Sequence, residues 1–214
     1  MNAEGKLSRL RLYALISEEH CRQGWLETAE ELLAGGVDAL QLREKSLSDG
    51  TFLQRARTLR KVTERFSALL IINDRPDVAC LSEADGVHLG QEDLPPAEVR
   101  KLVGADFLIG LSTHSPEQAA GAVEKGADYV GVGPAYPTAT KGYERGGGAE
   151  FVRNTCAATP LSTVAIGGIT PGRVAELMEA GADAVAVCGA LCGAEEPRKA
   201  AETFRRELED FHAG

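Results

Sequence analysis

Short hydrophobic runs rich in β-branched residues alternate with amphipathic stretches along the whole chain. The runs expected to form strands are residues 12–16, 39–43, 69–73, 86–89, 108–112, 129–133, 163–167 and 184–188. Several are almost continuously apolar, as is typical of parallel strands covered by helices. Between them, residues 25–34 and 48–66 carry hydrophobic side chains at helical spacing. This alternation predicts βαβ units with right-handed crossovers.

A short motif recurs four times, in which a glycine or alanine at the end of a helical stretch is followed by aspartate and then a strand. The four aspartates are Asp38, Asp85, Asp128 and Asp183. They precede the second, fourth, sixth and eighth expected strands, so each copy spans about two β/α units. Fourfold alternation of this kind indicates a closed eight-stranded barrel, in which alternate strands are equivalent.

The expected fold is therefore α/β: a single-domain (β/α)8 TIM barrel over residues 1–214, with residues 1–9 as a flexible tail. An open, doubly wound sheet of eight strands is the alternative. Prolines support the helix assignments, because each stands near the expected start of a helix, where a missing N–H is tolerated. These prolines are Pro76, Pro95 or Pro96, Pro116, Pro171 and Pro197.

Composition narrows the classes of partner. The formal net charge is −9, which argues against a nucleic-acid-binding protein with a basic face. No apolar run approaches the roughly 20 residues needed to cross a bilayer, and the first residues do not resemble a signal peptide, so no membrane partner is expected. Five scattered cysteines favour thiols in a reducing cytoplasm over a disulfide framework. A homo-oligomer is compatible with these features.

Polar residues gather where the second expected strand ends. Gln41 and Arg43 alternate with apolar neighbours and should project to the same side, into the barrel mouth, followed by Glu44 and Lys45. An amide and two cations at this place predict a cradle for a polyphosphate. The alternative is an exposed charged turn, which the cost of burying Gln41 and Arg43 without a ligand disfavours.

Two carboxylates follow the third and fourth strands. Asp74 and Asp93 should lie at one end of the barrel, where carboxylates and a substrate phosphate commonly hold Mg²⁺; helix N-capping is the alternative. Ser112, at the end of the fifth strand, is equally compatible with ligand contact and with helix capping. His88 and His114 fit hydrogen-bonded structural histidines better than proton shuttles.

The last three strands end in loops suited to a phosphate. Residues 134–148 form a long polar segment, with a lysine and two threonines, that could close over a ligand. Gly167 and Gly168 follow the seventh strand and Gly189 follows the eighth. Backbone N–H groups at these positions form the phosphate site usual in such barrels. Together with the cradle on the second strand, this predicts two phosphate subsites.

These motifs closely resemble those of the thiamine phosphate synthase family. The clearest are QLREK at 41–45, INDR at 72–75 and DGVHLGQEDLP at 85–95. The resemblance implies a TIM barrel and a transferase with two phosphorylated small-molecule substrates. It would join a hydroxymethylpyrimidine diphosphate to a hydroxyethylthiazole phosphate and release pyrophosphate. The implied mechanism is dissociative and assisted by Mg²⁺.

The resemblance also assigns residues. The pyrimidine diphosphate would be held by Gln41, Leu42, Arg43, Glu44, Lys45, Asn73, Ser112 and Lys141. The thiazole phosphate would be held by Thr138, Ala139, Thr140, Gly168, Cys188 and Gly189. Asp74 and Asp93 would bind Mg²⁺, and the catalytic cations Arg43, Lys45 and Lys141 would neutralise charge on the leaving pyrophosphate. Gly189 departs from the family, which often has serine at this position.

Two other functions share parts of this pattern. A thiazole tautomerase-like paralogue would use the same fold for acid/base chemistry, and a non-catalytic protein could bind the phosphate ligand alone. Neither needs the diphosphate and metal residues, so Lys45, Asp74, Asp93 and Lys141 favour the synthase.

Overall fold

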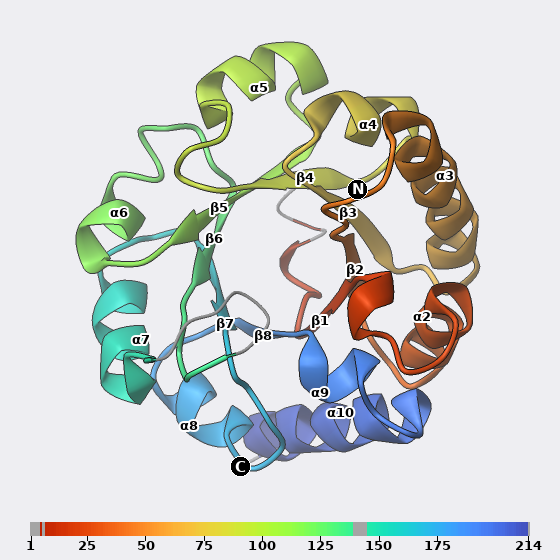
Figure 1. The fold of residues 1–214 in the computed structure, drawn as a ribbon. Coiled ribbons are helices and arrows are strands. Elements are labelled where there is room, and N and C mark those ends of the chain that lie inside the picture. Colours follow the sequence, from red (N-terminus) through yellow and green to blue (C-terminus); the bar gives the residue numbers. More distant parts are fainter. Residues whose placement is uncertain (1–4, 6, 139–144, 214) are drawn as a thin grey trace.

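The structure, a computed structural model, describes residues 5, 7–138 and 145–213. Eight parallel strands form a closed barrel in the order β1 to β8, and helices surround it (Figure 1). Tyr13 of β1 is in register with Ala39 of β2 on one side and Ala186 of β8 on the other. This closure confirms the TIM barrel and excludes the open sheet.

The strands lie where the hydrophobic runs predicted them. They are β1 (Leu12–Ile16), β2 (Ala39–Leu42), β3 (Leu69–Asn73), β4 (Gly86–Leu89), β5 (Leu108–Thr113), β6 (Tyr129–Val132), β7 (Ser162–Ile166) and β8 (Ala184–Val187). Three agree with the prediction residue for residue, and the others differ by one residue at one or both ends. Hydrophobic runs bounded by turn residues therefore sufficed to place the barrel.

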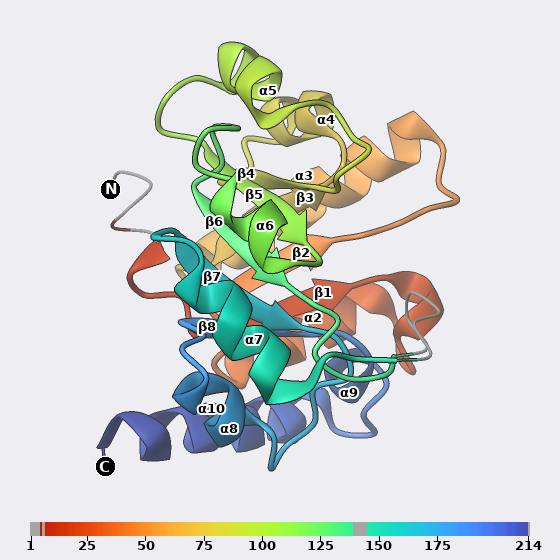
Figure 2. The same ribbon diagram turned by 90° about the vertical axis from the view of Figure 1, so that its left-hand side faces the viewer.

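The helices form the outer layer, which Figure 2 shows from the side. They are α2 (Trp25–Ala34), α3 (Asp49–Arg65), α4 (Pro76–Leu81), α5 (Pro96–Val103), α6 (Pro116–Ala120), α7 (Gly148–Ala157), α8 (Val174–Glu179), α9 (Gly189–Cys192) and α10 (Pro197–Ala213), with a 3-10 turn at Glu18–His20. Proline is the first residue of α4, α5, α6 and α10, while Pro171 stands in the turn before α8. No helix in the described ranges is long and apolar enough to cross a membrane.

Alternate residues of each strand separate two hydrophobic cores. In β1, Leu12, Ala14 and Ile16 pack outward against the helices, whereas Tyr13 and Leu15 point into the barrel. Leu7, which the sequence placed in a flexible tail, is buried in the inner core. Residues 1–4 and 6 lie outside the described residues.

The fourfold aspartate repeat forms a set of clamps at the amino ends of the strands. Each carboxylate accepts a backbone N–H from the preceding odd-numbered strand, and the backbone N–H of each aspartate donates to the carbonyl of the same residue. The pairs are Asp38–Leu12, Asp85–Leu70, Asp128–Ile109 and Asp183–Thr163, with Oδ2–N distances of 2.9, 3.0, 2.7 and 2.8 Å. The repeat therefore stabilises the barrel at the end opposite the loops that follow the strands.

Candidate active site

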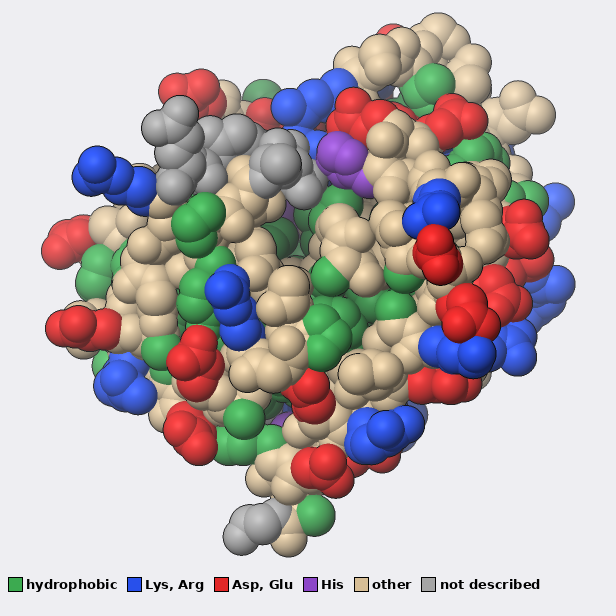
Figure 3. Space-filling view, turned by 60° about the horizontal axis from the view of Figure 1, so that its bottom comes forward, with side chains coloured by type: hydrophobic (Ala, Val, Ile, Leu, Met, Phe, Trp, Pro, Cys, Tyr) green, Lys and Arg blue, Asp and Glu red, His purple; other side chains and the backbone are tan. Residues whose placement is uncertain are grey.

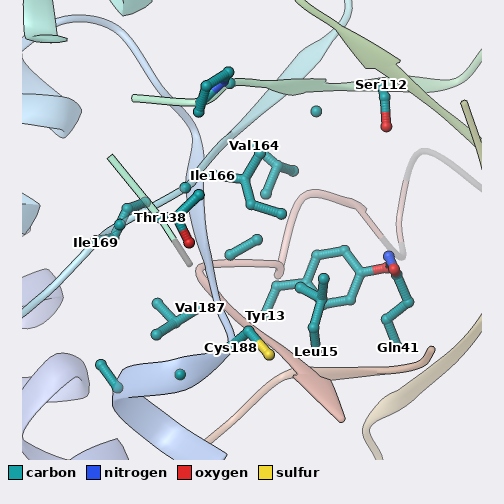
Figure 4. A pocket seen from close by; sticks show the side chains of 18 of the residues that line it. Tyr13, Leu15, Gln41, Ser112, Thr138, Val164, Ile166, Ile169, Val187 and Cys188 are labelled. Carbon is teal, nitrogen blue, oxygen red and sulfur yellow. Dashed lines mark hydrogen bonds between the residues drawn. The ribbon is translucent and has the colours of Figure 1, made fainter. Parts of the chain in front are cut away.

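A cavity of about 430 Å³ opens among the residues that end the strands and begin the following loops. Its walls are largely apolar: Leu15, Val164, Ile166 and Val187 surround it in Figure 4. Six of the residues predicted to bind substrate line it. They are Gln41, Ser112, Thr138, Gly168, Cys188 and Gly189. The structure therefore brings together one part of each predicted subsite.

A chain of polar side chains crosses the floor of this cavity. Gln41 Nε2 donates to the Tyr13 hydroxyl at 2.8 Å, a contact visible in Figure 4. The hydroxyls of Tyr13 and Tyr129 are 3.3 Å apart, and that of Tyr129 lies 3.1 Å from His88 Nδ1. His88 Nε2 in turn lies 2.9 Å from Ser112 Oγ. Each member of this network therefore lies on a different strand. Gln41 on β2 and Ser112 on β5 are its two ends.

Burial determines the ionisation of the two tyrosines in this chain. Desolvation is the largest cause that raises the pKa of Tyr13 and of Tyr129 well above the usual tyrosine value. Both phenols therefore stay neutral over the ordinary pH range and keep their O–H groups as donors. The floor of the cavity is consequently polar but uncharged at the tyrosines.

Glycines on β5 and β6 make room for His88. A Cβ at Gly110 would lie 2.2 Å from Tyr129 Cζ and 2.5 Å from His88 Nδ1, and one at Gly131 would lie 3.2 Å from His88 Cε1. His88 is buried and hydrogen-bonded at both ring nitrogens, and His114 Nδ1 is 2.6 Å from the Gly133 carbonyl. Both histidines are hydrogen-bonded within the fold, as the sequence favoured.

Ser112 does not cap the following helix. The residue that caps α6 is Ser115, whose hydroxyl accepts the Gln118 N–H at 3.3 Å. Ser112 instead lines the cavity. This position agrees with the ligand-contact alternative, although the contact itself stays a prediction.

The cationic end of β2 contains one buried charge. Arg43 is 5% exposed, and its Nη1 has no hydrogen-bond partner among the described residues. A buried guanidinium N–H without an acceptor is costly, which favours an anionic ligand at this point. Lys45, two residues further on, is exposed.

Glu44 and Leu42 do not line the cavity. Glu44 Oε1 accepts from Arg55 Nη1 at 2.5 Å and from the Glu18 backbone N–H at 2.9 Å. Arg55 in turn stacks over the Trp25 ring, with its guanidinium carbon 4.5 Å from the ring centroid. Leu42 packs in the outer core. Both residues therefore have structural roles, and their contact with substrate stays a prediction.

Asp74 and Asp93 lie in the loops that follow the neighbouring strands β3 and β4, as predicted. Asp74 follows Asn73 of β3, has a φ of 62°, and donates its backbone N–H to the His88 carbonyl at 2.9 Å. Asp93 Oδ2 accepts the Gly90 N–H at 2.6 Å. The N-cap positions of α4 and α5 are Arg75 and Pro95, so neither aspartate is the N-cap residue.

The donor set available for a metal is limited. Within the described ranges, no group of three or more His, Cys, Asp or Glu side chains is placed to hold a metal ion. Two carboxylates on adjacent loops fit Mg²⁺, which is commonly bound by one or two carboxylates, water and substrate phosphates. They do not form a complete protein cage. The arrangement therefore suits a metal that binds together with a diphosphate.

The glycine loops after β7 and β8 meet the β6 loop at the cavity. Gly167 and Gly168 have φ values of 103° and 61°, and a Cβ at Gly168 would lie 2.4 Å from the Pro137 carbonyl oxygen. Cys188 is the N-cap of α9, which begins at Gly189. Other side chains would clash at Gly168, so its packing against the β6 loop requires glycine. Ala139, Thr140 and Lys141 lie outside the described residues.

Sequence reasoning missed a cation in this part of the cavity. Arg173 lines it, donates from Nη1 to the Gly168 carbonyl at 3.1 Å, and lies over the Tyr136 ring with 4.1 Å between the guanidinium carbon and the ring centroid. The sequence feature that could have indicated this cation is its position directly after Gly172, in the turn between β7 and α8.

Figure 3 shows one face of the molecule. Basic and acidic side chains are interspersed on this face, and hydrophobic side chains line the hollow at its centre.

Comparisons with known proteins agree with this geometry. The family model for thiamine monophosphate synthase matches residues 12–191. Thiamine-phosphate synthase of Shouchella clausii is 41% identical over 202 residues, covering 94% of this chain and 97% of that protein. The enzyme of the same name from Synechocystis sp. is 41% identical over 203 residues, covering 95% of this chain but 58% of that protein. The chain therefore spans little more than half the length of some relatives.

A solved structure shows the same arrangement. Thiamine phosphate pyrophosphorylase from Pyrococcus furiosus superposes with a TM-score of 0.89 at 36% identity, covering 96% of this chain and 98% of that one. Family model, curated relatives and fold all agree. The chain belongs to the thiamine monophosphate synthase family, whose members are transferases.

Proposed function

We propose that the chain is a thiamine-phosphate synthase. It would condense 4-amino-2-methyl-5-(diphosphooxymethyl)pyrimidine with 4-methyl-5-(2-phosphooxyethyl)thiazole to give thiamine phosphate and pyrophosphate. The observation that carries the proposal is the buried Arg43 guanidinium, whose Nη1 has no acceptor in the described residues. Arg43 directly follows β2 and stands two residues after Gln41, which lines the cavity.

The pyrimidine would occupy the floor of the cavity. Its ring carries amino and ring-nitrogen groups, which suit the Gln41 amide and the Ser112 hydroxyl, while the apolar walls pack against its faces. The diphosphate would then extend to Arg43, Lys45 and Asn73, with Lys141 as a further cation. Charge-assisted hydrogen bonds from these groups would hold the leaving pyrophosphate.

Asp74 and Asp93 would hold Mg²⁺ at the adjoining loops. When bound there with the diphosphate, the metal would supply positive charge that stabilises the departing pyrophosphate. Arg43 and Lys45 would act on the same oxygens. Fixed charges of this kind stabilise the charge that develops as the bond breaks.

The thiazole phosphate would bind at the other side of the cavity. Backbone N–H groups around Gly168, Cys188 and Gly189 would contact the phosphate, with Thr138, Ala139 and Thr140 from the β6 loop. Arg173 already lies beside Gly168 and would add a positive charge to this subsite. Gly189 offers a backbone N–H but no side-chain hydroxyl.

The reaction would proceed by dissociation. The bond between the methylene carbon and the diphosphate oxygen would break first, giving a pyrimidine-stabilised cation, and the thiazole nitrogen would then attack the methylene carbon. The apolar walls support this order, because they limit the water that would otherwise capture the cation. Both ring nitrogens of His88 are hydrogen-bonded, one to Tyr129 and the other to Ser112. This favours a positioning role for His88 over nucleophilic attack.

The proposal is tested by incubating the protein with both substrates and Mg²⁺ and detecting products by chromatography and mass spectrometry. Thiamine phosphate should form only when both substrates are present. Conversion of one thiazole phosphate tautomer into another, without condensation, would instead support the tautomerase alternative. Binding of both ligands to folded protein without any product would support the non-catalytic alternative.

Two expectations about the protein's setting also stay predictions. A cytoplasmic location is tested by fractionating cells of the source organism and measuring where the protein is found. Homo-oligomer formation is tested by light scattering coupled to size-exclusion chromatography, which gives the molar mass in solution.

A further inference from the structure

Five polar side chains that line the cavity form one series of hydrogen bonds. The series runs from Gln41 through Tyr13, Tyr129 and His88 to Ser112, and we call it the polar network. Each of these residues is at most 9% exposed, so their polar atoms depend on protein partners rather than on bulk water. The atom that donates at one contact therefore decides which atom donates at the next.

The direction of the polar network is set at Gln41. Its Nε2 atom can only donate, and it donates to the Tyr13 hydroxyl at 2.8 Å. The hydrogen of that hydroxyl needs an acceptor of its own. Among the described residues its other partner is the Tyr129 hydroxyl, 3.3 Å away. Tyr13 therefore donates to Tyr129, because a buried O–H group without an acceptor is costly.

The same reasoning fixes the tautomer of His88. Because the Tyr129 hydroxyl accepts from Tyr13, it donates to His88 Nδ1, which lies 3.1 Å away. Nδ1 then carries no hydrogen, and a neutral imidazole has its hydrogen on Nε2. Nε2 therefore donates to Ser112 Oγ at 2.9 Å. Since Ser112 Oγ has no second partner in the described part of the chain, its own hydrogen can be donated to a ligand.

The opposite direction would invert every group of the polar network. If the Gln41 amide were turned over, its Oε1 would accept from Tyr13, His88 Nδ1 would donate to Tyr129, and Ser112 would donate to His88 Nε2. A ligand would then meet the amide NH2 group and a hydroxyl oxygen, instead of the amide oxygen and a hydroxyl hydrogen. The donation from Gln41 Nε2 to Tyr13 selects the first direction.

We propose that Tyr13, Tyr129 and His88 are positioning residues, which hold Gln41 Oε1 as an acceptor and the Ser112 hydroxyl as a donor and so select an amino group over an oxo group on the pyrimidine. Gln41 Oε1 has no hydrogen-bond partner in the described residues, and Gln41 lines the cavity. Oε1 would accept from the amino group, and Ser112 would donate to an acceptor of the same ligand. An oxo group would instead place a second acceptor against Oε1. This selectivity rests on the proposed function, whereas the direction of the polar network does not.

The direction is tested by nitrogen NMR of ligand-free protein that carries isotope-labelled histidine. Long-range proton–nitrogen correlations distinguish the two neutral tautomers from each other and from the imidazolium. The other three histidines are assigned with His20→Gln, His114→Gln and His212→Gln, which identifies the signals of His88. We expect His88 to carry its hydrogen on Nε2. Hydrogen on Nδ1, alone or together with Nε2, would overturn the proposal whether or not the protein is a synthase.

The selectivity is tested by measuring dissociation constants for the pyrimidine diphosphate and for its analogue with an oxo group in place of the amino group, with Mg²⁺ and without thiazole phosphate. Wild type should bind the amino form about 30-fold more tightly, the effect expected when a buried polar group loses its partner. Equal binding of the two forms would contradict the selectivity. Binding of neither form would overturn the proposed function as well, while the tautomer of His88 would still report on the polar network.

Two substitutions separate positioning from packing. Tyr13→Phe keeps the ring but lets the Gln41 amide turn over, so the ratio of the two dissociation constants should fall at least about fivefold. Tyr129→Phe should act in the same way, because Tyr13 then loses its acceptor and can donate to Gln41 Oε1. Tyr136→Phe is the matched control, since its hydroxyl donates to Glu176 outside the polar network, and it should keep the wild-type ratio. A wild-type ratio in both Tyr13→Phe and Tyr129→Phe would contradict the positioning role.

Discussion

Ser112 and His88, which lie on the neighbouring strands β5 and β4, are joined by a 2.9 Å contact between Oγ and Nε2. The contact places a hydroxyl at the edge of the cavity and fixes one end of the polar chain that runs through Tyr129 and Tyr13 to Gln41. Because every member lies on a different strand, the barrel itself holds the chain in place. This series of hydrogen bonds therefore connects the lining of the cavity to the inner core.

Ser112→Ala should affect both properties. Loss of the hydroxyl removes one partner of a buried imidazole nitrogen, so the free energy of unfolding should fall by about 1–2 kcal/mol, and the KM for the pyrimidine diphosphate should rise. Ser115→Ala is the matched control, since removing the cap of α6 should cost about 1 kcal/mol of stability without changing that KM. Equal KM values for wild type and Ser112→Ala would remove Ser112 from the site.

The buried tyrosines predict a loss of stability at alkaline pH. Tyr13 and Tyr129 have pKa values raised above the ordinary value of 10.0 by desolvation. In the unfolded chain they lose protons near pH 10 while the folded state keeps them. Their contribution is therefore complete below pH 10 and declines as the pH rises from 10 toward the folded pKa. Urea unfolding between pH 8 and 11.5 measures this decline, which should be smaller in Tyr129→Phe. Identical pH dependence in the two proteins would contradict it.

Arg43→Met should separate catalysis from stability. Removing the buried guanidinium should lower kcat/KM by about 10²–10³-fold, as for other fixed charges that stabilise a leaving group. The free energy of unfolding should stay the same or increase, because an apolar side chain replaces a buried charge. Steady-state kinetics and urea unfolding on the same preparation check both. A variant that loses stability in parallel with activity would show that Arg43 is structural.

Asp128→Ala should lower stability and leave catalysis unchanged, which is the reverse of the effect expected for Arg43→Met. Its carboxylate accepts from Ile109 N at 2.7 Å and from Arg100 Nη2 at 2.5 Å at the amino end of the barrel. Its loss should lower the free energy of unfolding by about 2 kcal/mol and leave kcat/KM of the folded protein unchanged. Glu98→Gln, which breaks the exposed ion pair with Lys101, should change stability by less than about 0.5 kcal/mol. Equal effects of the two substitutions would refute the clamp.

Local pattern predicted the barrel well because each strand and each aspartate repeat is encoded in a few consecutive residues. The role of the repeat was not predictable, since Asp128 acts on Ile109 through a pairing that exists only once the strands are adjacent. The same holds for the cavity floor: Gln41 and Tyr13 are separated by a whole helix in sequence. Motif resemblance grouped Glu44 with its neighbours, whereas its side chain turns toward Arg55 of α3.

The proposed synthase reaction requires both substrates to react at one end of the barrel with metal held by Asp74. Phosphorus NMR of a single sample containing protein, Mg²⁺ and both substrates follows every phosphorus atom. Wild type should release one pyrophosphate for each thiamine phosphate formed. Asp74→Asn, in which asparagine tolerates the same φ, should be at least about 100-fold slower, whereas Asp77→Asn on the exposed side of α4 should behave like wild type. Unchanged turnover in Asp74→Asn, or pyrophosphate without thiamine phosphate, would contradict the account.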